Sequence, residues 1–366
     1  MAAGLNLPWA SPSGRRDPGR GRYLAGLLVA LLMSAQLVSL VGWWHVPYYV
    51  LSPGPTASVT GLVTVDPAHH HPVKGQVLLT TVYESRARVI DFLLSWAHSD
   101  SVLTSTQDIA GNLTPAELQQ LNQAEMTLSE NQAKVAALRR AGYSVPEHGT
   151  GAQVVAVLAN TAATGRLNAG DTIIAVNGRP TNLEQDVAAA LAAVKPGQSV
   201  ALTVQDRSRV QRQVIATLGP RPGAPSLGFL GVELATRDDR FDFPFPVSIN
   251  AEGIGGPSAG LAFTLGILDE LTSGNLTGGH NVAATGTIDF DGTVGDVGGV
   301  AQKTVSVSRS GATLFLVPPG EYATARAHAG PNLKVVQVST LNQALAAIAQ
   351  NGGSLAGLPP SPAGIK

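Results

Sequence analysis

Residues Gly253–Gly260, GIGGPSAG, decide the fold of the last third of the chain, because the apolar run LAFTLGILDEL follows them at 261–271. This run predicts a buried helix, with Ser258 at its start among very small residues. N–H groups in the first turn of a helix have no partners within the helix, and the helix dipole favours negative charge there. Ser258 is therefore a candidate nucleophile. The oxyanion and substrate loop predicted around it is Gly255, Gly256, Pro257 and Ala259.

A serine hydroxyl needs a base, and the stretch GTVGDVGGVAQK at 292–303 offers Lys303. The pattern is a hairpin arm that ends in two glycines, followed by a helix with Lys303 in its first turns. A lysine acts as a base only when its pKa falls from about 10.4 toward neutrality, which burial among apolar side chains achieves. The neighbours of Lys303 are apolar enough, whereas the single histidines His280 and His328 are interpreted as loop residues.

Both stretches resemble the proteolytic domain of Lon-type proteases, which use a Ser-Lys dyad. Ser258 falls in that family's G-P-S-A-G motif, and Lys303 ends its T-G…G-x-V…G-G…K phrase, 45 positions later (303 minus 258). The other matching residues are Thr285, Gly286, Gly292, Val294, Gly298 and Gly299. The resemblance covers residues 225–350 and implies a mixed α/β (α+β) serine endopeptidase domain. The family's Lys-Asp pair before Gly-Pro-Ser is replaced by Ile254 and Gly255.

No Walker A motif accompanies this domain. The nearest phrase, GGVAQKT at 298–304, lacks the glycine that precedes the lysine of a P-loop. The sequence therefore predicts an ATP-independent peptidase without a cofactor or a metal. Such an enzyme cleaves flexible, misfolded or exposed segments of polypeptides, because it has no motor to unfold stable substrates.

A second unit is indicated by GRLNAGDTIIAVNGRP at 165–180, which is followed by a predicted helix at 183–194. The phrase L-x-x-G-D-x-I-x-x-V-N-G resembles bacterial protease-associated PDZ domains, which bind peptide ends by strand addition beside a helix. We assign residues 142–219 to this β-rich unit, with a Gly- and Pro-rich linker up to Pro225. The glycine-rich carboxylate-binding loop of PDZ domains is not evident, and its nearest candidate is 141–151.

The segment 60–141 has no obvious domain of its own. It contains a predicted strand at 77–82 and two predicted helices, 115–126 and 130–141, each preceded by a capping-box pattern, at Thr114 and Ser129. An unaccompanied buried strand needs a partner. The sequence leaves open whether this segment packs on the peptidase domain, which would make the PDZ-like unit an insertion.

The N-terminal part contains residues 23–41 without a charge, which is long enough to span a bilayer as a helix. Four arginines, at 15, 16, 20 and 22, precede this run, and no Lys or Arg follows it before Lys74. The positive-inside rule predicts a cytoplasmic tail at 1–22, a transmembrane helix at 23–44 and an extracytoplasmic catalytic domain in the cell membrane. A cleaved signal peptide is the alternative.

The amino-acid composition excludes several kinds of catalytic site, metal site and partner. The absence of cysteine excludes thiol nucleophiles, disulfides and Cys-based zinc sites. The nearly balanced charge, −1 in total, argues against a nucleic-acid partner. The triple histidine 69–71 is interpreted as a solvated loop rather than a metal site, and the proline-rich tail 351–366 as disordered. Two alternatives stay open: a membrane-tethered PDZ adaptor with a Lon-like scaffold, and a homo-oligomeric ring like those of Lon-type domains.

Overall fold

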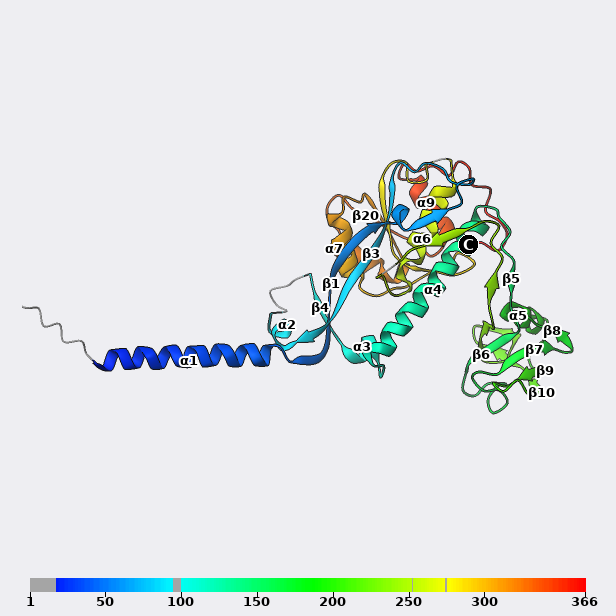
Figure 1. Ribbon diagram of the computed structural model, residues 1–366. Coiled ribbons are helices and arrows are strands. Elements are labelled where there is room, and N and C mark those ends of the chain that lie inside the picture. The colour runs from blue at the N-terminus through cyan, green and yellow to red at the C-terminus, as the bar shows by residue number, and fades with distance from the viewer. Residues whose placement is uncertain (1–17, 95–99, 252, 274) are drawn as a thin grey trace, which may run out of the picture.

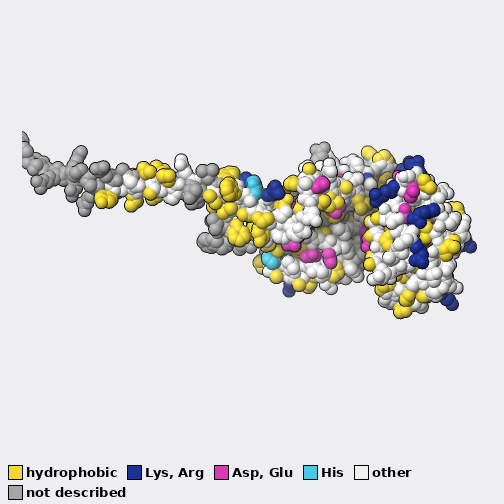
Figure 2. Space-filling model, turned by 90° about the horizontal axis from the view of Figure 1, so that it is seen from below, with side chains coloured by type: hydrophobic (Ala, Val, Ile, Leu, Met, Phe, Trp, Pro, Cys, Tyr) yellow, Lys and Arg dark blue, Asp and Glu magenta, His cyan; other side chains and the backbone are white. Residues whose placement is uncertain are grey.

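The computed structural model describes residues 18–94, 100–251, 253–273 and 275–366. A long helix, α1 (Pro18–Gly42), leads into a two-stranded arm, which enters an α/β unit, and a smaller β-rich unit lies beyond it (Figure 1). Figure 2 shows the same extended arrangement in a view turned by 90°. This arrangement confirms a mixed α/β protein with an additional β-rich unit. Among the described residues, no helix combines the length and the hydropathy that a membrane span requires. The predicted cytoplasmic tail lies mostly outside the described residues.

The central sheet has six strands in the order β20-β19-β16-β3-β1-β4. Its members are β1 (His45–Ser58), β3 (Gln76–Arg88), β4 (Val102–Ser105), β16 (Asn281–Ala284), β19 (Leu314–Val317) and β20 (Lys334–Gln337). Strand β3 contains the predicted strand 77–82 and pairs antiparallel with β1 and parallel with β16. Segments from both ends of the chain therefore share one sheet.

Helices cover both faces of this sheet. On one face, α4 (Pro115–Arg140), α6 (Gly260–Leu271) and α9 (Leu341–Ala349) enclose the main core, which includes Leu79 and Phe263. On the other face, α7 (Val300–Arg309) and α8 (Tyr322–His328) pack over Leu78 and Phe315. Leu78 and Leu79 point to opposite faces because side chains alternate along a strand. The sheet is therefore buried on both sides where it carries α6 and α7.

The prediction of two helices between 115 and 141 is wrong, because α4 runs unbroken from Pro115 to Arg140. The first predicted start is confirmed: Thr114 accepts from the N–H of Glu117, and Glu117 accepts from the N–H of Thr114. Ser129 repeats the sequence pattern but caps nothing. Its buried hydroxyl instead donates to the carbonyl of Pro257, 128 residues away, so a tertiary contact replaces the predicted capping bond.

Short elements complete the α/β unit. Two small antiparallel pairs are β2 (Val63–Val65) with β15 (Val247–Ile249), and β17 (Thr287–Ile288) with β18 (Val294–Gly295). The remaining pieces are η1 (Val59–Gly61), α2 (Val89–Leu94), α3 (Thr106–Ala110), η3 (Pro257–Ala259) and η4 (Pro319–Glu321).

The β-rich unit is a sheet in the order β10-β9-β7-β6-β13, with β8 paired to β7. Its elements are β6 (Ala152–Val157), β7 (Thr172–Val176), β8 (Arg179–Pro180), α5 (Glu184–Ala192), β9 (Ser199–Gln205), β10 (Gln211–Thr217), β11 (Gly219–Arg221), β12 (Ala224–Phe229) and β13 (Val232–Thr236). Their buried side chains form a separate core.

The predicted boundary between the two units, at 219–225, is wrong. Strand β13 pairs antiparallel with β6, so the chain stays in the β-rich unit to Thr236. The Gly and Pro residues interpreted as a linker form the hairpin of β11 and β12, which turns at Gly223 with φ of 77°. Glycine adopts this left-handed conformation without strain. The ribbon of β5 (Glu147–His148) and β14 (Arg240–Phe241) then pairs the entering chain with the returning chain.

The prediction of a disordered tail at 351–366 is also wrong. Leu355 and Leu358 pack against the main core, and Ile365 is only 9% exposed. Arg140 Nη1 donates to the carbonyl of Pro359 at 2.8 Å. Composition alone suggested disorder because the segment is rich in proline and glycine. The three apolar side chains, spaced along the tail, nevertheless provide enough burial to hold it against the helices.

Candidate active site

The loop before α6 places Ser258 at the beginning of that helix. Gly256 has φ of 83°, and the 3-10 turn η3 (Pro257–Ala259) then runs directly into α6 at Gly260. Ser258 is half-buried. Gly260 has no room for a side chain, since a Cβ there would lie 2.8 Å from Ser129 Oγ. The small residues of the motif thus allow the loop to pack closely against neighbouring backbone.

Helix α4 fixes this loop through two hydrogen bonds. The N–H of Gly256 donates to the carbonyl of Asn122 at 3.1 Å, and Ser129 Oγ donates to the carbonyl of Pro257 at 3.1 Å. Ser129 is fully buried, so its bond to Pro257 is shielded from water. Because α4 precedes the β-rich unit in the sequence, this support was not visible from the motif itself.

Lys303 lies in the first turn of α7, and its backbone N–H donates to the carbonyl of Gly299 at 3.0 Å. Gly299 has φ of 70°, which permits the sharp entry into the helix. The side chain of Lys303 is buried: the residue is 2% exposed. Its Nζ donates to Thr285 Oγ1 at 3.3 Å.

Thr285 connects the lysine with the serine residue. Its hydroxyl accepts from Lys303 Nζ and donates to the carbonyl of Ser258 at 3.4 Å. The N–H of the next residue, Gly286, donates to the same carbonyl at 3.0 Å. From the sequence, Thr285 is only one of the residues that match the Lon-type motif. Its place at the end of β16, between two elements distant in sequence, gives it a positioning role.

Burial lowers the pKa of Lys303 to about 8, although the carboxylates of Glu321 and Glu84 raise it. The charged ammonium is disfavoured where water is excluded, and no carboxylate forms an ion pair with Nζ in the described residues. A substantial fraction of this amine is therefore neutral near pH 8 and able to accept a proton.

Two of the predicted oxyanion donors do not fit the geometry. Pro257 has no N–H, and the N–H of Gly256 already donates to Asn122. Gly255 is exposed beside Asn122, and Ala259 is buried at the start of the helix. The amides of Ser258 and Ala259 remain the candidates within the predicted range.

The triple histidine is better packed than a solvated loop. The ring of His69 stacks on Phe245 with centroids 4.0 Å apart, and His70 Nδ1 lies 3.7 Å from Glu270 Oε2. In the described part of the chain, no three His, Asp or Glu side chains gather as metal ligands would.

Family models match two parts of the chain: the PDZ domain over residues 121–205, and the Lon protease (S16) C-terminal proteolytic domain over residues 247–349. The chain matches a PDZ-containing Lon-like peptidase. The chain thus contains a serine-protease domain of the Lon type together with a PDZ module. The first match begins inside α4 of the α/β unit, whereas the β-rich sheet itself spans Ala152–Thr236.

Solved structures match 23% of the chain. The PDZ domain of the SdrC-like protein from Listeria innocua is 20% identical and aligns over 23% of this chain and 92% of its own, with a TM-score of 0.21. Its counterpart from Listeria monocytogenes is 21% identical, over 23% and 87%, with the same TM-score. A solution structure from Geobacillus thermodenitrificans is 33% identical, over 23% and 95%, also at 0.21. No curated protein matches the chain.

The PDZ domain has one strand with an unpaired edge beside its helix. Strand β13 ends the sheet path, and the N–H of Glu184, at the start of α5, donates to Thr236 Oγ1. At the other end of α5, the N–H of Gly228 donates to the carbonyl of Val194. The glycine-containing phrase LGFLG at 227–231, which was assigned to the peptidase domain from the sequence, therefore lies at the C-terminal end of this helix. The candidate loop 141–151 contacts the other end, where Gln185 Nε2 donates to Glu147 Oε2 at 3.0 Å.

Proposed function

We propose that this peptidase hydrolyses peptide bonds through a Ser-Lys dyad, with Ser258 as nucleophile and Lys303 as general base. The observation that carries the proposal is the buried amine of Lys303, whose pKa is lowered to about 8. The hydroxyl of Thr285 connects this amine to the backbone carbonyl of Ser258. A lysine on a protein surface keeps its proton at neutral pH and cannot act in this way.

In the proposed reaction, neutral Lys303 takes the proton of the Ser258 hydroxyl while the oxygen attacks the scissile carbonyl. The N–H groups of Ser258 and Ala259, at the start of α6, stabilise the oxyanion, and the helix dipole adds to their effect. The protonated lysine then gives its proton to the leaving amine. Water attacks the acyl-enzyme, with Lys303 again as base, and restores the free hydroxyl.

We further propose that the enzyme works without ATP, anchored in the cell membrane by residues 23–44, with its catalytic domain on the extracytoplasmic side. The support is the missing P-loop, the uncharged run 23–41 and the arginines that precede it. The substrates are flexible or misfolded polypeptides. Assembly into a ring is part of the proposal, and sedimentation of the detergent-solubilised protein tests it.

The PDZ domain is proposed to bind a substrate or regulatory peptide as an added strand on β13, beside α5. PDZ ligands pair with a sheet edge next to a helix, and β13 combines both features. The exposed Ile215, on β10 at the opposite end of the sheet path, provides a control position for binding measurements.

The test is hydrolysis of casein by the full-length protein in detergent without nucleotide, compared with Ser258→Ala. We expect cleavage by the wild-type protein and none by the variant. Equal residual activity in both proteins would instead favour a membrane-tethered adaptor without catalytic activity. Cleavage that depends on added nucleotide would contradict the proposed ATP independence.

A further inference from the structure

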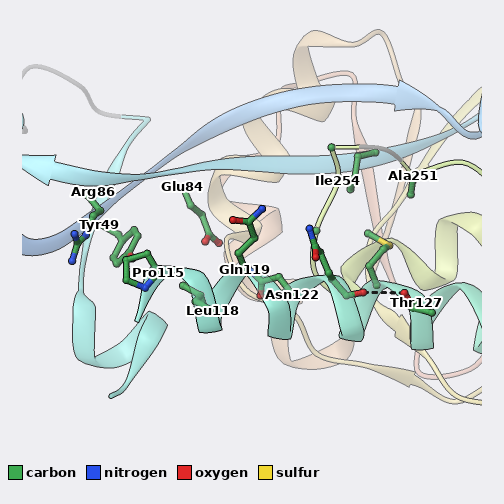
Figure 3. Close-up of a pocket in the computed structure, with 14 residues that line it drawn as sticks. Tyr49, Glu84, Arg86, Pro115, Leu118, Gln119, Asn122, Thr127, Ala251 and Ile254 are labelled. Carbon is green, nitrogen blue, oxygen red and sulfur yellow. Dashed lines mark hydrogen bonds between the residues drawn. The ribbon is translucent and has the colours of Figure 1, made fainter. Parts of the chain in front are cut away.

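A cavity of about 700 Å³ lies beside the nucleophile loop, between the first half of α4 and the arm of β1 and β3 (Figure 3). The arm contributes Arg86 and Glu84, of which Glu84 points toward α4, and the loop contributes Ile254. The cavity is as large as typical ligand sites, which measure about 300–1,000 Å³.

The helical wall of this groove carries one regular row of side chains. Pro115, Leu118, Gln119, Asn122 and Met126 line it, and their spacing of three or four residues places them on one face of α4. At 1.5 Å per residue, the row from the first to the last of them is about 17 Å long. That length matches about five residues of extended polypeptide, at about 3.3 Å each.

The groove is continuous with the proposed dyad at two points. Gly255, three residues before Ser258, lines its inner end, and the carbonyl of Asn122 holds the N–H of Gly256 there. Glu84 lies close enough to Lys303 to act on the pKa of that amine. The groove therefore ends beside the loop that carries Ser258.

We propose that this groove binds an extended segment of the substrate polypeptide, about five residues long, next to the bond that Ser258 attacks. The proposal rests on the function proposed above and adds a substrate-binding site to it.

The side chains that line the groove favour an extended polypeptide as its ligand. The side-chain amides of Gln119 and Asn122 each donate and accept hydrogen bonds, and a polypeptide backbone offers both partners at every residue. Leu118 and Ile254 provide apolar contact for side chains of any shape. One carboxylate and one guanidinium, from Glu84 and Arg86, leave the groove without a strong net charge. The groove therefore fits unfolded polypeptide of varied sequence rather than a charged small molecule.

The test compares Gln119→Trp with Gln120→Trp in the full-length protein. Both glutamines are exposed on α4, but only Gln119 lines the groove. For a quenched peptide of about ten residues, Gln119→Trp should raise KM about tenfold with kcat retained, because the indole occupies the groove. A peptide of about four residues, which reaches only the dyad, should be cleaved at the wild-type rate by both variants. Gln120→Trp should match the wild type throughout.

A second measurement does not depend on turnover. A photo-crosslinking amino acid in place of Gln119 should capture casein in the Ser258→Ala background, and the same amino acid in place of Gln120 should not. Equal KM values for the two tryptophan variants, together with equal capture at both positions, would contradict substrate binding in the groove. This conclusion would hold even if wild-type cleavage depends on Ser258. Loss of all cleavage dependence on Ser258, with capture still specific to position 119, would instead overturn the dyad and leave polypeptide binding in the groove standing.

Discussion

The two domains differ in how their cores are assembled from the sequence. The PDZ core is contiguous: Val154, Ile173 and Leu202 come from one uninterrupted stretch. The peptidase core combines Leu79 and Leu138, before that stretch, with Phe263 and Leu345, after it. Local contacts form faster than contacts between distant residues, because closing a long loop costs more entropy. We therefore expect the PDZ domain to fold as a unit of its own, whereas the peptidase domain can fold only after both of its sequence halves have come together.

The comparison also shows where the catalytic loop depends on the rest of the chain. Ser129, on α4, holds Pro257 across the whole insertion. The PDZ domain sits in the chain between the support and the supported loop, and the β5–β14 ribbon brings both sides of the insertion together. The nucleophile loop is thus a product of the discontinuous domain rather than of its own motif. Four predictions test this contrast.

The largest effect is expected from removing either member of the proposed dyad. Ser258→Ala and Lys303→Met should each lower hydrolysis of a short peptide by about a thousandfold or more. Methionine retains the volume and the apolar packing of the buried lysine stem, so the domain should stay folded. Lys195→Met, an exposed lysine of the PDZ domain, is the matched control and should retain full activity. Comparable activity of Lys303→Met and its control would contradict lysine as the base.

Core truncations in the two domains should separate their stabilities. Leu202→Ala in the PDZ domain and Leu265→Ala in α6 each remove a fully buried side chain and should cost about 2–5 kcal/mol of folding free energy. Hydrogen exchange read by mass spectrometry should show faster exchange only in the truncated domain. Short-peptide hydrolysis should fall with Leu265→Ala and persist with Leu202→Ala. Loss of protection across both domains in either variant would show that they fold together.

Activity should rise with pH through the titration of Lys303. Only the neutral amine accepts a proton, and its lowered pKa of about 8 means that the protonated form dominates at pH 6. Between pH 6 and pH 9, kcat/KM for a short peptide should therefore increase about a hundredfold and then level off. A kcat/KM that does not change over this pH range would contradict Lys303 as the general base. Exchange protection of the PDZ domain, measured over the same range, should not follow this titration.

The smallest effect is expected from the support that α4 gives to the loop. Ser129→Ala removes the donor from α4 to the carbonyl of Pro257 and leaves only the N–H of Gly260 on it, which should lower kcat about tenfold through misplacement of the loop. Leu128→Ala, at the exposed neighbouring position, should change kcat little. Equal rates for the two variants would show that the loop holds its geometry without α4.

Local patterns predicted much of the fold. The capping box at Thr114, the strand within β3 and the turn at Asn177 and Gly178 depend on neighbours in sequence, and the structure contains them. The predictions that failed depend on distant contacts. Ser129 resembles a cap but bonds to Pro257, β13 belongs to the PDZ sheet because it pairs with β6, and the tail is ordered because Ile365 finds a core.

The sequence by itself determined the choice of residues for the candidate site, since the two motifs and their spacing single out Ser258 and Lys303. Only the tertiary structure decided how these residues are held: Thr285 lies between them, and α4 supports the loop from the other side of an inserted domain. The physical reason is that motif residues act through local backbone geometry. The burial that lowers the pKa of Lys303 depends on the packing of α7 against β1 and β3, which come from the other half of the chain.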